Sequence, residues 1–66
     1  MLQLTPLQEK LFNYLVDHKK PVTIAKLAYH FLVAPSMVSR ALLGLHHAGL
    51  ADRKRVNRQF FYEIKQ

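Results

Sequence analysis

The chain has 66 residues, and ten Lys and Arg residues outnumber four Asp and Glu residues, for a formal net charge of +6. A chain this short normally makes one domain, which excludes a catalytic cleft between domains and nearly excludes a doubly wound nucleotide-binding sheet. The hydrophobic fraction of 50% is too high for a disordered basic tail, so we expect a folded domain that attracts anions. The chain contains no cysteine, which excludes a disulfide framework and a thiolate zinc site.

The sequence predicts no targeting or membrane segment. Its first residues lack the basic stretch followed by an apolar stretch that marks a secretion signal. No apolar run approaches the roughly 20 residues that a membrane span needs. We therefore expect a cytoplasmic protein with no membrane partner.

Three helices are predicted, over residues 5–18, 23–31 and 35–48. Thr5 and Gln8 have the spacing of a capping box, and Thr23 is expected to cap the second helix. Pro35 suits the first turn of the third helix, and Gly49 is expected to end it. The link between the second and third helices is only about three residues long, which forces a steep crossing as in a helix-turn-helix.

The apolar period changes after the third helix, where Phe60, Tyr62 and Ile64 alternate with other residues as in a half-buried strand. The preceding stretch can pair with this strand across a tight turn at Asn57 and Arg58, because Asn tolerates the left-handed backbone. Strands are predicted over residues 50–56 and 59–65. Residues 1–66 are thus expected to form a single α+β domain, mainly α, with a C-terminal two-stranded hairpin.

The third predicted helix has two distinct faces. Its apolar face comprises Val38, Ala41, Leu42, Leu45 and Ala48. Its other face comprises Ser36, Ser39, Arg40, Leu43, Gly44 and His47. This second face carries no acid and suits the major groove of DNA, and Gly44 is expected to permit a close approach. Arg40 is the best candidate for a base contact, since Arg paired with guanine is the commonest specific contact, although a phosphate contact or plain solvation is equally compatible.

Three motifs resemble those of bacterial winged helix-turn-helix domains of the broad MarR-like and PapI-like kind. Leu27-Ala28 is similar to the "LA" of the family's first motif helix. Residues 38–45 resemble its "VSRxLxxL" recognition helix, and residues 49–53 resemble the "GLhxR" sequence that leads into the wing. Leu32 stands where many such proteins have Gly, so we expect a turn without a left-handed residue. The resemblance implies a winged-helix fold, binding to double-stranded DNA and regulation of transcription.

The candidate DNA-contacting residues form two sets. Base contacts from the recognition helix are expected from Ser36, Ser39, Arg40, Leu43 and His47. Backbone or wing contacts are expected from Lys26, Arg53, Lys54, Arg55, Asn57 and Arg58. The resemblance implies that the wing lies along the backbone or enters the adjacent minor groove, and its cation density suits counterion release. Cations on an edge strand can also serve only to prevent aggregation.

The main alternative is a winged-helix protein–protein adaptor that binds an acidic partner. Leu43 on the predicted groove face and the broad apolar side of the first helix keep this alternative open. The apolar side chains Leu7, Phe12 and Val16 could supply a homodimer interface, while a monomer or a dimer formed only on DNA fits the sequence equally well. RNA binding ranks third, because the sequence lacks an evident platform of exposed aromatic residues. No catalytic constellation or metal-ligand spacing is evident, so we expect no enzyme activity, cofactor, metal or small-molecule effector.

Overall fold

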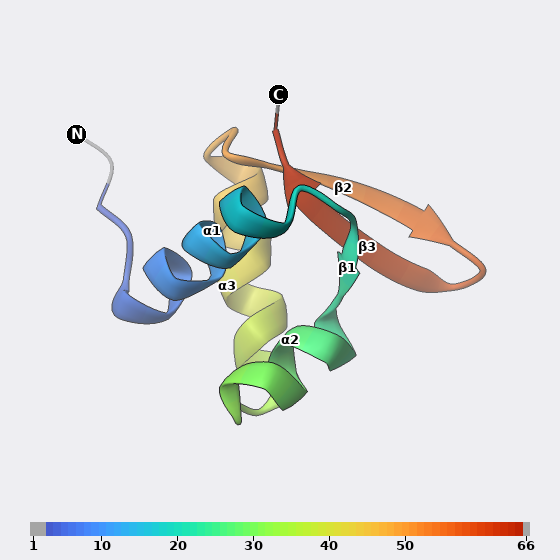
Figure 1. Ribbon diagram of the computed structural model, residues 1–66, viewed down its shortest axis with the longest axis horizontal. Helices are drawn as coiled ribbons and strands as arrows, with labels where there is room; N and C mark the ends of the chain where they lie inside the picture. The colour runs from blue at the N-terminus through green and yellow to red at the C-terminus, as the bar shows by residue number, and fades with distance from the viewer. Residues whose placement is uncertain (1–2, 66) are drawn as a thin grey trace.

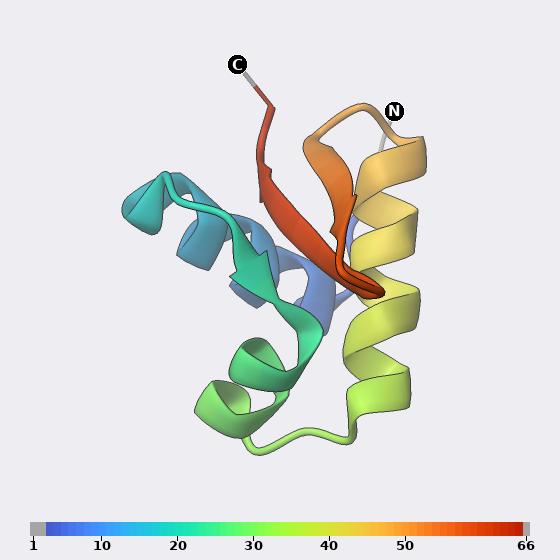
Figure 2. The same cartoon turned by 90° about the vertical axis from the view of Figure 1, so that its right-hand side faces the viewer.

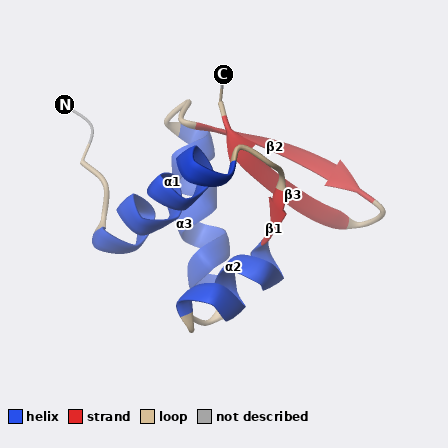
Figure 3. Cartoon of the chain, in the orientation of Figure 1, coloured by secondary structure: helices blue, strands red, loops and turns tan. Residues whose placement is uncertain are grey.

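The computed structural model describes residues 3–65, so Met1, Leu2 and Gln66 of the predicted domain lie outside the described residues. The elements follow in the order α1 Pro6–His18, β1 Val22–Thr23, α2 Ile24–Phe31, α3 Pro35–His47, β2 Ala51–Val56 and β3 Gln59–Ile64. Figures 1 and 3 show α1 and α2 packed beside α3, with the β2–β3 hairpin projecting away from the helices. The predicted α+β class, with three helices followed by a hairpin, is confirmed.

Side-chain caps define the start of the first two helices, as the sequence predicts. The Gln8 backbone N–H donates to Thr5 Oγ1 at 3.1 Å, and the Thr5 N–H donates to Gln8 Oε1 at 3.0 Å, which completes the capping box of α1. Thr23 Oγ1 accepts from the Lys26 N–H at 3.1 Å at the start of α2. α3 begins at Pro35 without a side-chain cap. Proline suits this position because its missing N–H is one that the helix leaves unbonded.

The ends of α2 and α3 share one backbone motif, in which a left-handed residue closes the helix. At the end of α3, Gly49 has a φ of 80°, and the Leu50 N–H donates to Leu45 O at 3.0 Å. At the end of α2, Leu32 has a φ of 55°, and the Val33 N–H donates to Ala28 O at 3.0 Å. These are the bonds of a Schellman motif. The expected stop at Gly49 is confirmed, whereas the expectation of a turn without a left-handed residue is wrong, because Leu32 itself adopts that conformation.

In the described part of the chain, the sheet has three strands in the order β1-β3-β2, one more than the predicted two-stranded hairpin. The short strand β1 pairs antiparallel with β3, with Val22 opposite Tyr62. β2 pairs with β3 across the predicted turn, where Asn57 and Arg58 have φ values of 49° and 68°. Positive φ at both central residues is the requirement of a type I′ turn, whose twist matches that of the flanking strands.

Each of the helices and strands described above contributes to one hydrophobic core. Its buried members are Leu11, Tyr14, Leu15, Val22, Leu27, Ala28, Val38, Ala41, Leu42, Leu45, Ala51 and Tyr62. Fully burying one Leu side chain contributes about 1.5–3 kcal/mol, so these residues fix α1, α2 and the sheet against α3. No helix within residues 3–65 is long and apolar enough to cross a membrane.

Candidate nucleic-acid interface

α3 lies along one edge of the molecule, and Figure 2 shows its outer side facing away from α1 and α2. The predicted apolar face is buried at Val38, Ala41, Leu42 and Leu45, whereas Ala48 is exposed at the end of the helix. Of the predicted base-contacting residues, Ser36, Arg40 and His47 are exposed, and Ser39 and Leu43 are half-buried. The outer side of α3 is thus polar and basic, with one partly exposed Leu at its centre.

Gly44 faces α1, which differs from the expected approach to DNA. The Gln8 side chain of α1 reaches across to α3, where its Nε2 donates to Ala41 O at 3.4 Å. A Cβ placed on Gly44 would overlap Gln8 Nε2. The missing side chain at Gly44 therefore accommodates the α1–α3 contact.

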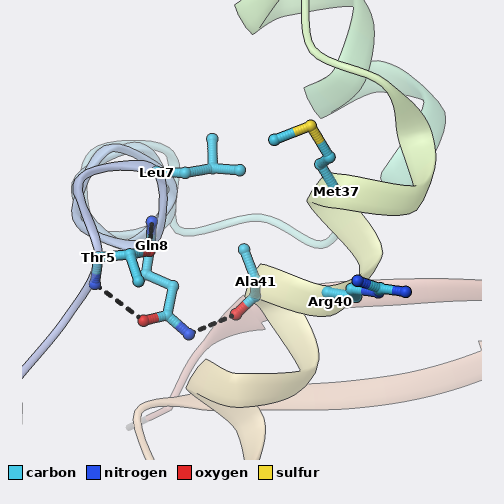
Figure 4. A pocket seen from close by; sticks show the side chains of 6 residues that line it. All are labelled: Thr5, Leu7, Gln8, Met37, Arg40 and Ala41. Carbon is cyan, nitrogen blue, oxygen red and sulfur yellow. Dashed lines mark hydrogen bonds between the residues drawn. The ribbon is translucent and has the colours of Figure 1, made fainter.

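A shallow pocket of about 400 Å³ lies between the start of α1 and the first turns of α3. It is lined by Thr5, Leu7, Gln8, Met37, Arg40 and Ala41. Figure 4 shows Leu7 and Met37 pointing toward one another, while the side chain of Arg40 runs away from α1. Arg40 thus borders the pocket and directs its guanidinium to the outer side of α3.

Strand alternation divides the β2–β3 hairpin into two faces. The inner face comprises Ala51, Arg53, Arg55, Phe60, Tyr62 and Ile64. The outer face comprises Asp52, Lys54, Val56, Gln59, Phe61 and Glu63. Ala51 and Tyr62 are 1% and 2% exposed, which identifies the inner face as the one that continues from the core. The three consecutive cations of β2 are adjacent in the sequence but lie on different faces of the hairpin. Arg53 and Arg55 share the inner face, and Lys54 lies on the outer face.

Phe60 brings the two inner arginines together. The Cζ atoms of Arg53 and Arg55 lie 4.7 Å and 5.8 Å from the centroid of the Phe60 ring. Both distances are within the range of cation–π attraction. Phe60 is half-buried and packs against the core, as expected, but its contact with the two arginines is an additional feature that the sequence reasoning missed.

The remaining predicted wing and backbone residues lie near the start of α2 and at the hairpin turn. Lys26 is exposed on the first turn of α2, and Asn57 and Arg58 are exposed at the turn. Arg58 also borders a pocket of about 230 Å³ together with Thr23, Ile24, Ala25, Gln59 and Phe60. The structure thus brings Arg58 beside the N-terminus of α2, a proximity that the sequence spacing does not reveal.

No protein-family model matches this sequence, and no curated protein shows a significant match to it. Solved structures share the fold. The ST1889 protein of Sulfolobus tokodaii is 26% identical with a TM-score of 0.88, over 94% of this chain and 62% of that one. A cysteine-to-serine variant of Lactococcus lactis ZitR in complex with DNA is 25% identical with a TM-score of 0.84, and the match covers 100% of this chain and 46% of the ZitR chain. The transcriptional regulator BldR of Sulfolobus solfataricus is 24% identical with a TM-score of 0.83, over 98% and 48%.

These structures are winged-helix proteins, and the agreement extends over nearly the whole of this chain. The chain is a winged helix-turn-helix domain. The resemblance indicated by the sequence motifs is therefore confirmed. The domain spans about half the length of the ZitR and BldR chains that it matches.

In this winged helix-turn-helix, α2 and α3 form the motif and the β2–β3 hairpin forms the wing. His46 connects the two parts, because its Nδ1 lies 3.0 Å from Ala51 O at the start of the wing. His18 stacks on Tyr14 with a centroid separation of 3.8 Å, and His30 lies 4.9 Å from the same ring. Among residues 3–65, no three His, Asp or Glu side chains are grouped so that they could hold a metal ion.

The apolar surface of the winged-helix domain differs from the one expected on α1. Leu7 and Phe12 are half-buried and pack against the core, and Val16 is 37% exposed. Among residues 3–65, the most exposed large apolar side chains belong to α2 and the turn after it, where Tyr29 and Leu32 are 84% and 87% exposed. The helical period alone could have placed Tyr29 opposite the buried face of α2.

Proposed function

We propose that this winged-helix domain binds double-stranded DNA sequence-specifically and thereby regulates transcription. The observation that carries the proposal is the outward, acid-free side of α3 next to a strongly basic wing. The fold supports it as well, since the ZitR variant with the same fold is in complex with DNA. In the proposed complex, α3 lies in the major groove and the wing lies on the backbone or in the minor groove.

Arg40 is assigned the main base contact. Its guanidinium extends from the outer side of α3, where two parallel N–H donors can pair with guanine O6 and N7. Ser36 and Ser39 lie near the start of the helix, where short hydroxyl side chains can reach base edges or phosphates. Leu43 offers an apolar contact for a thymine methyl group, and His47 marks the far end of the contact surface.

Lys26 and the wing residues Arg53, Arg55, Asn57 and Arg58 are assigned contacts with the DNA backbone, whereas Lys54, on the other face of the wing, is assigned no contact. Each neutralised phosphate releases condensed counterions, so the affinity should fall steeply with salt. If about five phosphates are neutralised, a tenfold rise in salt should weaken binding by more than about a thousandfold. Such contacts fix the register of the protein on DNA and carry no sequence information themselves.

Fluorescence anisotropy with a selected and a random duplex tests these roles. Binding sites are first selected from a random duplex pool, which also reveals whether the protein reads one half-site or two symmetric ones. We expect Arg40→Ala to relax the preference for the selected duplex. Arg58→Ala should weaken binding to both duplexes similarly and reduce the dependence of log affinity on log salt concentration by about one unit of slope. Lys10→Ala, on the exposed side of α1, is the charge-matched control. Equal losses on both duplexes for Arg40→Ala would remove its base-reading role.

One observation favours a second candidate function, that of a protein–protein adaptor with an acidic partner. Tyr29 and Leu32 together expose apolar surface next to the basic Lys26 side of α2. Titration with a mixed duplex at low salt separates the two functions. Binding at micromolar protein supports the DNA-binding function, and its absence favours the adaptor.

A further inference from the structure

The cations of the wing lie in different electrostatic surroundings. The inner face carries Arg53 and Arg55 and no acidic side chain. On the outer face, Lys54 is accompanied by Asp52 and Glu63, which lie directly opposite one another. A polyanion is therefore attracted to the inner face more than to the outer one, because the charges of each face largely set its local potential.

The inner arginines are also ordered by an aromatic ring. Both guanidinium groups lie over Phe60, at 4.7 Å for Arg53 and 5.8 Å for Arg55, and the ring is itself fixed by packing against the core. A guanidinium that stacks on an aromatic face keeps the N–H donors at its edge available for phosphate oxygens. On the outer face, Phe61 lies opposite Lys54, so the two faces form a natural comparison.

We infer that Phe60 is a positioning residue for DNA binding, and that the inner face of the wing, with Arg53 and Arg55, is the face that contacts phosphates. This inference rests on the proposed DNA-binding function. Its physical basis is preorganisation: a side chain that is ordered before binding loses less conformational entropy when it meets its partner. Phe60 thus contributes to affinity without touching DNA.

Substitutions at Phe60 distinguish the effect of the aromatic ring on DNA binding from the effect of an apolar side chain at this position. Phe60→Leu keeps an apolar side chain and all the positive charges but removes the ring, and we expect DNA binding about three- to tenfold weaker. Phe60→Tyr keeps the ring and should bind like the wild type. Phe61→Leu makes the same change on the outer face and should stay within about twofold of the wild type.

The salt dependence distinguishes positioning from loss of charge. Phe60→Leu should lower the affinity at every salt concentration without changing the slope, because the number of cations is unchanged. Arg53→Ala should reduce the slope by about one, whereas Lys54→Ala, which removes the same charge from the outer face, should leave it nearly unchanged. Thermal unfolding of each variant reports whether the domain remains folded under the binding conditions.

Side-chain order in the free protein gives a readout that loss of stability alone would not change. Nuclear relaxation of the arginine Nε–Hε groups should show greater picosecond-to-nanosecond mobility of Arg53 and Arg55 in Phe60→Leu than in the wild type. The same groups should remain ordered in Phe60→Tyr and Phe61→Leu. The measurement needs no DNA and therefore tests the positioning step by itself.

The outcomes separate this inference from the function on which it rests. Wild-type protein that binds no duplex overturns both. Wild-type protein that binds DNA, with Phe60→Leu binding equally well or Phe60→Tyr failing to restore affinity, overturns the positioning role and leaves the DNA-binding function standing. Equal changes in slope for Lys54→Ala and Arg53→Ala overturn the assignment of the inner face.

Discussion

Leu32 offers a test of how much a left-handed residue costs at the end of α2. Its backbone has a φ of 55°, and its side chain is 87% exposed, so Leu32→Gly removes the backbone strain while losing little buried surface. Gly49 already occupies the equivalent position at the end of α3. Leu32→Gly should therefore give both helices the same glycine stop.

The expected gain follows from three opposing contributions. A left-handed conformation costs a non-glycine residue about 1–2 kcal/mol. Glycine loses more backbone entropy on folding, which destabilises the variant by about 0.5–1 kcal/mol. Only about an eighth of the Leu side chain is buried, which is worth about 0.2–0.4 kcal/mol. We expect Leu32→Gly to stabilise the domain by about 0.5 kcal/mol relative to the wild type.

Leu32→Ala is the matched control, because it loses the same buried surface but retains the left-handed cost. The free energy of unfolding of Leu32→Gly should exceed that of Leu32→Ala by about 0.8 kcal/mol, which corresponds to about 3–6 °C in Tm for a domain of this size. Urea unfolding followed by circular dichroism measures the difference, and equal m-values establish that the unfolded states are comparable. A glycine variant no more stable than the alanine variant would show that the surrounding structure relieves the strain at Leu32.

Three further substitutions test the caps, the helix contact and the wing turn. Thr23→Ala removes the N-cap of α2 and should destabilise the domain by about 1 kcal/mol in urea unfolding, whereas Thr23→Ser should restore most of the loss. Gly44→Ala should leave DNA affinity within about twofold of the wild type in anisotropy titrations, because Gly44 faces Gln8 on α1. A large loss of affinity would instead place Gly44 against DNA. Arg58→Gly should raise Tm, because glycine adopts a φ of 68° without strain, and should weaken DNA binding with a salt slope reduced by about one. Unchanged DNA affinity would remove Arg58 from the contact surface.

The local signals in the sequence were sufficient for the helices and the hairpin. The capping residues Thr5 and Thr23 and the stop at Gly49 act within a few residues of the helix ends that they define, so their spacing can be read directly. β1 is different, because it has only two residues and pairs with a strand at the other end of the chain. So short a segment has no measurable period, and its pairing depends on where the helices place it.

The contacts of the candidate site divide in the same way. A two-residue turn at Asn57 and Arg58 fixes the register of the hairpin, so Arg55 opposite Phe60 follows from the predicted turn by counting. The Gln8–Gly44 contact does not follow from either helix alone. The period of α3 led us to place Gly44 on the face expected to meet DNA, and only the position of α1 determines that Gln8 approaches it.

Leu32 and Arg58 both have a left-handed backbone, which costs conformational free energy, but their side chains differ in the contacts that they can make. Leu32 is almost fully exposed and lies next to exposed Tyr29. Only the burial of this apolar side chain against a partner would offset the strain of its backbone. Arg58 places a cation at the wing turn, where a DNA phosphate would recover the cost on binding. Arg58→Gly should therefore stabilise the free protein and weaken its binding to DNA, whereas Leu32→Gly should stabilise the free protein and leave the DNA affinity unchanged. The stability and DNA affinity of these two variants thus distinguish a left-handed residue that contacts DNA from one that does not.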